Sequence, residues 1–263
     1  MIKRFLKKVF NKITLRNYRE QVLYEQKATR IEITRLYDQV FLNNPVMVIN
    51  NVKMYLPLFY VDHIQKIIYQ THNFYEAETL EFLKLHYKKL DHIIDIGSNI
   101  GNHMLYYCSN LQPVKVHCFE PNPFNLEVLK KNIAINYLDK MVTAYPVALG
   151  AENGKGVQKN FTLDNTGMNR VDKLTDEQET GNAVDIRSLD DFHFSQVSFI
   201  KIDVEGFELE VLKGAEQTIK QSKPVVMVEV FESSRQNVDA LMGQYGYKKF
   251  ITLEQYNSLY VPL

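Results

Sequence analysis

The stretch His92-Ile-Ile-Asp-Ile-Gly-Ser-Asn-Ile-Gly-Asn-His103 decides the fold of this chain. An apolar run leads into two glycines, and a helix-like segment from Asn102 to Cys108 follows them. Gly97 allows the backbone to reverse, and Gly101 allows the next helix to lie close to whatever occupies the turn. The pattern predicts a nucleotide-binding turn between a strand and a helix.

The turn lacks part of the pyrophosphate-binding fingerprint. Gly-x-Gly-x-x-Gly would place glycine where this chain has Asn99 and Asn102, so close approach to two phosphates is not provided for. This disfavours a nicotinamide-dependent oxidoreductase and suits a ligand without phosphates. Asp95 ends the strand and is placed to accept hydrogen bonds or to meet a positive charge. S-adenosylmethionine offers both an ammonium and a sulfonium group.

A second carboxylate follows one helix and one strand later. Residues 114–120 read as the next parallel strand, and Glu120 stands at its carboxyl end, nineteen residues after Gly101. An acid in this place commonly accepts two hydrogen bonds from the ribose diol of a bound nucleoside. The glycine turn and this acid together predict a nucleoside site.

Five motifs in this order resemble the FkbM family of S-adenosylmethionine-dependent methyltransferases: residues 95–101, 119–123, 200–208, 211–215 and 226–229. The resemblance runs from about residue 74 to residue 263. It implies a class I Rossmann-like methyltransferase, with a mostly parallel seven-stranded sheet and helices on both faces. It also implies S-adenosylmethionine as cofactor and, in most members, O-methyl transfer to sugars or polyketide-type hydroxyls.

The order of elements predicts one catalytic domain over residues 74–263 and an N-terminal extension over residues 1–73. A chain of 263 residues, 45% of them hydrophobic, suffices for one sizeable α/β core. In the extension we expect a basic helix, a second helix and a β-hairpin that turns at Asn50 and Asn51. Asn73 is expected to cap a helix over residues 75–89. The glycine-rich, polar stretch over residues 150–193 is expected to form loops and a substrate lid.

Residues 1–20 carry seven basic side chains and one acidic side chain, so the rest of the chain carries −6. Apolar residues recur there at helical spacing, which is typical of a helix on an anionic membrane surface. The alternative is that this stripe packs on the protein or on a second copy. An acidic remainder would repel phosphates, so no nucleic-acid partner is expected.

The predicted catalytic residues are Asp203 and Glu205, two acids at the end of the strand that starts near Val197. If the strand stays extended, Asp203 and Glu205 lie on one face, where one of them removes the proton from an acceptor hydroxyl. Two alternatives remain open: a divalent cation held by these acids with Glu229, and a helix-capping role for Glu205 or Glu208. His103 is a rival base, and no metal is included in the predicted site.

The predicted cofactor contacts surround the glycine turn and the strand ends. The resemblance places Glu76 near the cofactor, and Asn99 and Asn102 are expected to donate amide protons to its carboxylate or to a bound water. Ala148 lies where the adenine edge is expected, with no acid for the exocyclic amine, which leaves its recognition to backbone groups. The predicted set is Glu76, Asp95, Gly97, Asn99, Gly101, Asn102, Glu120, Asn122, Ala148 and Asp203.

The sequence therefore predicts an O-methyltransferase that modifies a hydroxyl of a glycan or glycan precursor, either a small molecule or lipid-linked. Two alternatives stay open: a methyltransferase for a non-sugar small molecule, and a non-catalytic, cofactor-binding assembly factor attached to a membrane. Cys108 and Cys118 have neither metal-ligand nor disulfide spacing, which favours a reducing compartment. We expect a cytoplasmic protein with peripheral attachment at the inner membrane face.

Overall fold

The computed structural model describes residues 41–87, 89–159, 162–167, 170–173, 183–254 and 256–263, with residues 23, 26, 27 and 29. The basic helix expected over residues 1–20 lies outside the described residues, as does nearly all of the second expected helix. Residues from Met47 to Leu263 form one compact unit. The domain boundary expected at residue 73 stays a prediction.

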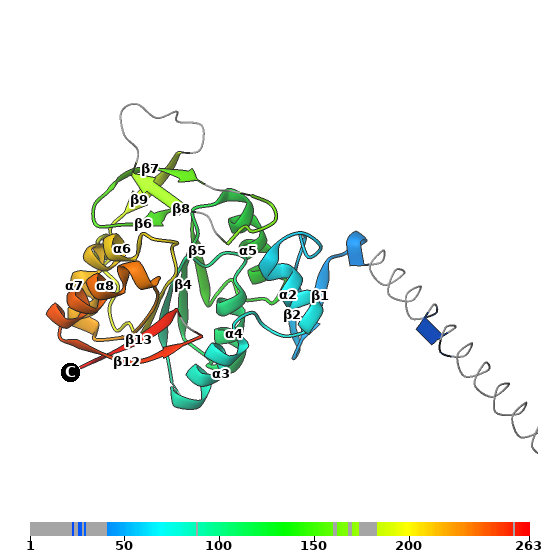
Figure 1. The fold of residues 1–263 in the computed structure, drawn as a ribbon, viewed down its shortest axis with the longest axis horizontal. Helices are drawn as coiled ribbons and strands as arrows, with labels where there is room; N and C mark the ends of the chain where they lie inside the picture. The colour runs from blue at the N-terminus through cyan, green and yellow to red at the C-terminus, as the bar shows by residue number, and fades with distance from the viewer. Residues whose placement is uncertain are drawn as a thin grey trace, which may run out of the picture. The chain divides into compact units, whose positions relative to one another are not determined.

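A seven-stranded sheet forms the centre of this unit, in the order β12-β13-β11-β10-β3-β4-β5 (Figure 1). Neighbouring strands from β11 to β5 pair in parallel, and β13 runs antiparallel to both β11 and β12. The predicted mostly parallel sheet with one antiparallel strand is confirmed. The strands are β3 His92–Ile96, β4 Lys115–Phe119, β5 Val142–Tyr145, β10 Phe199–Ile202, β11 Val225–Glu229, β12 Tyr247–Leu253 and β13 Asn257–Pro262.

Helices cover both faces of the sheet (Figure 1). One face carries α3 Ala77–His86, α4 Asn102–Asn110 and α5 Pro123–Ile135, and the other carries α6 Glu208–Gly214, α7 Glu216–Ser222 and α8 Glu232–Gln244. The single helix expected over residues 208–221 is two helices, because Ala215 leaves the helical region with φ −110° and ψ 7°. Helix α2, His63–Thr71, was not predicted.

The start of α3 differs from the prediction. Asn73 caps no helix, because its side-chain oxygen accepts the neighbouring N–H of Phe74 at 2.9 Å. The residue before α3 is Glu76, whose φ of 54° lies in the left-handed region. The chain therefore turns sharply at Glu76 and enters the helix two residues later than expected.

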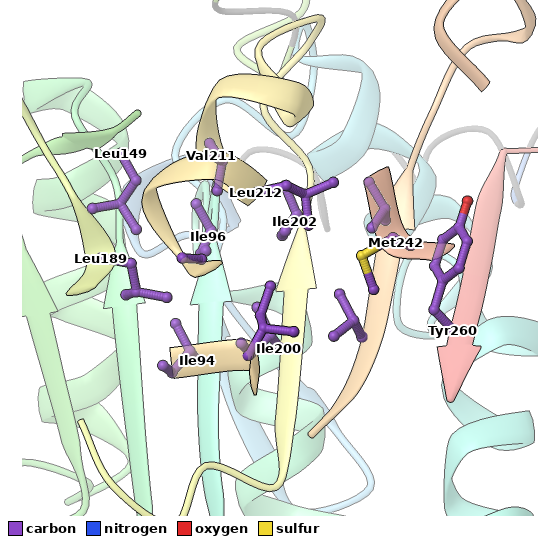
Figure 2. Packing of buried hydrophobic residues seen from close by; sticks show 14 of the residues in the cluster. Ile94, Ile96, Leu149, Leu189, Ile200, Ile202, Val211, Leu212, Met242 and Tyr260 are labelled. Atoms are coloured by element: carbon purple, nitrogen blue, oxygen red, sulfur yellow. The ribbon is translucent and has the colours of Figure 1, made fainter. Parts of the chain in front are cut away.

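Alternate residues of the central strands point to opposite faces. Ile94, Ile96, Ile200 and Ile202 are buried on the face of α6 and α8, where they pack with Val211, Leu212 and Met242 (Figure 2). Burying one such side chain contributes roughly 1.5–3 kcal/mol. The opposite face carries Asp95 and Lys201, which are register partners of β3 and β10.

The predicted β-hairpin is confirmed as β1 Val46–Ile49 and β2 Val52–Tyr55, with positive φ at both turn asparagines. The side chains of Asn132 in α5 and of Asn136, which directly follows this helix, bind the backbone of β2. Asn136 accepts the N–H of Lys53 at 2.9 Å and donates to its carbonyl at 2.6 Å. Asn132 accepts the N–H of Tyr55 at 2.6 Å. The helix thus occupies the place of a further strand.

The prediction of a loop over residues 150–193 is wrong for much of the part that the structure describes. Two residues that precede it and three segments within it form a four-stranded sheet in the order β6-β9-β7-β8. The strands are β6 Ala148–Leu149, β7 Gly154–Lys159, β8 Arg170–Lys173 and β9 Ala183–Arg187. Val184 and Ile186 are buried between exposed neighbours and pack with Ala148 and Val171. This alternation is the signal of a half-buried strand, and glycine and polar content concealed it.

Candidate active site

A cavity of about 280 Å³ opens at the carboxyl ends of β3, β4, β10 and β11. Ligands of open α/β sheets bind at this edge. The predicted residues that line the cavity are Gly97, Asn99, Glu120, Ala148, Asp203 and Glu205. They come from segments far apart in the sequence, and the parallel sheet brings their strand ends together.

The two glycines of the turn have different neighbours. Gly97 has φ 76°, and a Cβ there would lie 1.8 Å from the carbonyl oxygen of Asp203. Only glycine permits this approach of the turn to the end of β10. Gly101 does not line the cavity, and a Cβ there would lie 2.7 Å from Leu129 of α5. The close packing expected of Gly101 is therefore against α5 and not against a ligand.

Glu120 lies where the ribose acid was predicted, and only 5% of it is exposed. Its carboxylate accepts two backbone N–H groups at 2.8 Å, from Asn99 and from Asn122. Burial raises the pKa of Glu120 to about 7, although both hydrogen bonds act to lower it. The two hydrogen bonds fix the carboxylate in place. Each oxygen keeps a free lone pair, so the carboxylate can still accept hydrogen bonds from a diol.

A buried ammonium joins the glycine turn to the acidic part of the cavity. Lys201 Nζ lies 3.0 Å from Asp203 Oδ2, 3.1 Å from the carbonyl oxygen of Gly97 and 3.7 Å from Asp95 Oδ1. Burial acts to lower the pKa of Lys201, but the carboxylates of Asp203 and Asp95 outweigh it and raise the pKa above its ordinary value. The positive charge that Asp95 meets is thus Lys201. Asp95 was expected to contact the cofactor, but it does not line the cavity.

Three carboxyl groups line the other part of the cavity: Asp203, Glu205 and Glu229. The expected same-face arrangement is wrong, because β10 ends at Ile202 and the chain turns at Glu205, with φ 54°. This turn brings Glu205 to the cavity. Burial, and then the charge of Asp203, raise the pKa of Glu205 to about 7. The Asp203 charge, and then burial, also raise the pKa of Glu229.

The structure bears on the two alternative roles of these acids, helix capping and metal binding. Glu208 accepts the N–H of Gly206 at 2.6 Å, in the turn before α6, so it binds this turn, and its capping of the helix itself stays a prediction. Glu205 makes no such bond among the described residues. Nor do the described residues contain a group of three His, Cys, Asp or Glu side chains placed to hold a metal ion.

Asn102 and Asn122, both expected at the ligand, bind backbone instead and do not line the cavity. Asn102 accepts the N–H of Tyr75 and donates to its carbonyl, both at 3.0 Å. Asn122 caps α5 by accepting the N–H groups of Phe124 and Asn125. The side chains needed for local turns are therefore not available to a cofactor.

Glu76 and His103 bind each other outside the cavity lining. His103 Nε2 lies 3.1 Å from one Glu76 oxygen, and Asn257 donates to the other at 2.7 Å. Burial acts to raise the pKa of Glu76, but these partners outweigh it and lower the pKa to about 2. The first turn of α4 directs His103 to the start of α3, so the structure does not place it as a base at the cavity.

Several residues in or next to the cavity lining were missed by the sequence analysis. Lys201, which binds the lining residues Gly97 and Asp203, had a readable signal, since it is a single charge within the apolar strand Phe199–Ile202. The segment over residues 165–167, with His63 and Ile64 of α2, gave none, because it reaches the cavity only through tertiary contacts. Asn125, Phe231 and Tyr256 also line it.

The family model described as the methyltransferase FkbM domain matches residues 95–249, from the glycine turn into β12 and over more than half of the chain. The chain belongs to the FkbM methyltransferase family. Its predicted enzyme class and cofactor are therefore confirmed: it is an S-adenosylmethionine-dependent methyltransferase.

Two curated relatives of this FkbM methyltransferase show how far the similarity extends. Methyltransferase sdnD of Sordaria araneosa is 29% identical over 188 residues, which cover 59% of this chain and 73% of that protein. Hexuronic acid methyltransferase AglP of Haloferax volcanii is 27% identical over 209 residues, covering 76% and 82%. A crystal structure of Methyltransferase FkbM from Methylobacillus flagellatus KT is 18% identical with a TM-score of 0.49. The match covers 76% of this chain and only 55% of that one.

The residues of the FkbM cavity fit S-adenosylmethionine. Glu120 offers fixed carboxylate oxygens to a diol, and Val147, Ala148 and Leu149 supply apolar surface. The side-chain oxygens of Asn99 and Asn125 are buried and have no hydrogen-bond partner among the described residues. Buried acceptors of this kind call for a ligand with N–H or O–H groups.

Among the described helices, none has the length and apolarity to cross a bilayer.

Proposed function

We propose that this methyltransferase modifies a hydroxyl oxygen of a glycan or glycan precursor, with Glu205 as the general base. The observation that carries the proposal is the position of Glu205, which lines the cavity without a hydrogen-bond partner among the described residues, where burial raises its pKa to about 7. A base is most effective when its pKa lies near the working pH, and a positioned base contributes about 10²–10⁴-fold. S-adenosylmethionine, when bound, supplies an electrophilic methyl group on a sulfonium centre.

The three acids of the cavity have separate tasks in this proposal. Lys201 binds Asp203 at 3.0 Å, which fixes the Asp203 carboxylate in place. The charge of Asp203 raises the pKa of Glu205 and of Glu229. Glu229 keeps its proton and donates toward Asp203, whereas Glu205 has no hydrogen-bond partner among the described residues and is free to take a proton.

Two features support a sugar as the acceptor. The rings of Phe231 and Tyr256 line the cavity with centroids 5.7 Å apart, and they are 42% and 40% exposed. Half-exposed aromatic faces beside carboxylate oxygens suit a ring with both C–H faces and hydroxyl groups. The relative AglP, from Haloferax volcanii, is named as a hexuronic acid methyltransferase.

Methyl-labelled S-adenosylmethionine tests the proposal with three acceptor panels: nucleotide sugars, lipid-linked oligosaccharides and non-sugar hydroxyl compounds. We expect label on a sugar oxygen, located by mass spectrometry. Glu205→Gln should lower the rate about 10²–10⁴-fold and leave S-adenosylhomocysteine affinity unchanged. Glu216→Gln, on the exposed surface of α7, is the matched control.

Each contrary outcome has a distinct meaning. A full rate in Glu205→Gln removes the assigned base. Label on the non-sugar panel alone supports the methyltransferase with a non-sugar acceptor. No label on any acceptor, with the cofactor still bound, supports the non-catalytic assembly factor.

The partner proposed for residues 1–20 is an anionic membrane surface, on the strength of their seven basic side chains and one acid. Sedimentation with phosphatidylserine vesicles tests this. We expect the full chain to sediment at low salt, and the chain without residues 1–20 to stay in solution while binding S-adenosylhomocysteine normally. Equal sedimentation of both chains would refute the membrane proposal.

A further inference from the structure

The side-chain amide of Asn125 is buried in the cavity wall, and one of its two polar atoms has no hydrogen-bond partner among the described residues. Asn125 is the third residue of α5 and is 1% exposed. Its backbone N–H donates to Asn122 Oδ1 at 3.1 Å, and its Nδ2 donates to the carbonyl of Thr166 at 3.0 Å. Its Oδ1 is buried and has no partner among the described residues. This oxygen is an acceptor that calls for a donor.

The orientation of this amide follows from its neighbour. A carbonyl oxygen accepts and cannot donate, so the Asn125 atom that faces Thr166 must be the nitrogen. The oxygen is therefore the atom left for a ligand. A buried acceptor without a donor destabilises the protein, and such atoms are uncommon in native structures. Since Asn125 lines the cavity, a ligand there can supply the missing donor.

Asn125 is close to the predicted ribose acid through two hydrogen bonds. Glu120 Oε1 accepts the N–H of Asn122 at 2.8 Å, and Asn122 Oδ1 accepts the N–H of Asn125. The adenosine half of the cofactor carries both hydroxyl donors and an exocyclic amine. The lining residues that follow β5, Val147, Ala148 and Leu149, include no acid to meet that amine, and the exposed Glu152 beyond them does not line the cavity. Recognition by backbone groups alone, as the sequence suggested, leaves the Asn125 oxygen unexplained.

We propose that the side-chain oxygen of Asn125 accepts a hydrogen bond from the adenosine half of S-adenosylmethionine and makes Asn125 a specificity-determining residue for the cofactor. The donor is either the exocyclic amine of adenine or a ribose hydroxyl. The inference concerns the cofactor alone and holds whichever acceptor is methylated.

A purely structural role must be separated from this one. Asn125 also holds the segment at Thr166, whose N–H and Oγ1 bind the buried carboxylate of Asp62 at 2.8 Å and 2.9 Å. A variant that loosens this segment would weaken every ligand alike. Thr166→Val is the matched control, because it removes the hydroxyl contact with Asp62 and keeps the carbonyl that Asn125 binds.

The experiment is calorimetric titration of wild type, Asn125→Ala and Thr166→Val with S-adenosylhomocysteine and three analogues. The analogues lack the 6-amino group, the 2′-hydroxyl or the 3′-hydroxyl. We expect Asn125→Ala to bind S-adenosylhomocysteine about tenfold more weakly, as the loss of one buried hydrogen bond predicts. It should bind one analogue as wild type does, and that analogue identifies the donor. Thr166→Val should show no such preference.

Two results would overturn the proposal: equal affinities of Asn125→Ala and wild type for all four ligands, or one common factor of weakening for all four. Circular dichroism confirms that the variant is folded. If Asn125→Ala does not fold, Asn125→Gln replaces it, because it keeps an amide that can donate to the Thr166 carbonyl but moves the side-chain oxygen by one methylene. That variant should lose the discrimination against one of the three analogues. Discrimination equal to that of the wild type against all three analogues would refute the assignment.

Discussion

Glu120 and Glu205 stand in different parts of one cavity, and burial raises the pKa of each to about 7. Their surroundings differ in hydrogen bonding. Glu120 follows a rigid strand and accepts two backbone N–H groups at 2.8 Å. Glu205 stands in a turn with positive φ, without a hydrogen bond among the described residues. In our proposal, a similar proton affinity serves two tasks: the fixed carboxylate of Glu120 binds the cofactor, and the unbound carboxylate of Glu205 accepts a proton.

Lys201 connects the two parts of the cavity, and its removal should have the largest effect. Lys201→Met leaves the Asp95 and Asp203 carboxylates without their buried cation, which should lower the free energy of unfolding by about 3–5 kcal/mol. Urea denaturation measures it. The control Lys213→Met removes an exposed ion pair with Glu210 and should change stability by less than about 0.5 kcal/mol. Similar losses in both variants would contradict the role of Lys201.

Gly97 sets the distance between the turn and the end of β10. Gly97→Ala puts a Cβ against the carbonyl of Asp203 and forces a positive φ on alanine, so we expect a loss of about 2–4 kcal/mol in unfolding free energy. Gly154→Ala is its control, because nothing lies within 4 Å of the added Cβ. Thermal denaturation of both variants checks the difference. A stable Gly97→Ala protein would show that the turn has room.

Exchanging each acid for its amide separates binding from proton transfer. Glu120→Gln should weaken S-adenosylhomocysteine about tenfold, because a neutral amide accepts more weakly from hydroxyl groups. Glu205→Gln should change this affinity by less than about twofold, since its task is in the reaction step. Calorimetric titration gives both values. If the two variants lose affinity equally, the proposed division of the cavity is wrong.

The pH dependence offers the smallest and most specific effect. Glu120 and Glu205 ionise as the pH rises through about 7. Cofactor affinity should therefore increase a few-fold from pH 6 to pH 8, and so should the turnover number at saturating cofactor. Glu120→Gln should flatten only the affinity profile, and Glu205→Gln only the rate profile of its residual activity. Two flat profiles in the wild type would refute both assignments.

The sheet was predictable because its signals are local. Apolar runs that end at Gly97, Glu120 and Asp203 mark parallel strands whether or not their partners are known. Parallel order then brings the strand ends to one edge, so the position of the cavity followed from the sequence. The positive φ at Glu76 and Glu205 has no such local signal, and both residues were placed wrongly in detail.

Contacts distant in sequence account for the remaining errors. The bond of Thr166 to Asp62 joins residues 104 apart, and no spacing rule connects them. Asn102 and Asn122 were assigned to the cofactor, but each binds backbone that must be satisfied when water is excluded. A polar residue next to a site motif has two possible tasks, and only the tertiary structure decides between them.

The asparagines at the end of α5 that bind β2 have a consequence for association between molecules. A strand at the edge of a small sheet presents unpaired N–H and C=O groups, which can recruit a strand from another molecule. Asn132 and Asn136 already occupy these groups at Tyr55 and Lys53. A second chain would have to displace both amides before it could pair with β2. The helix thereby protects the hairpin against edge-to-edge aggregation.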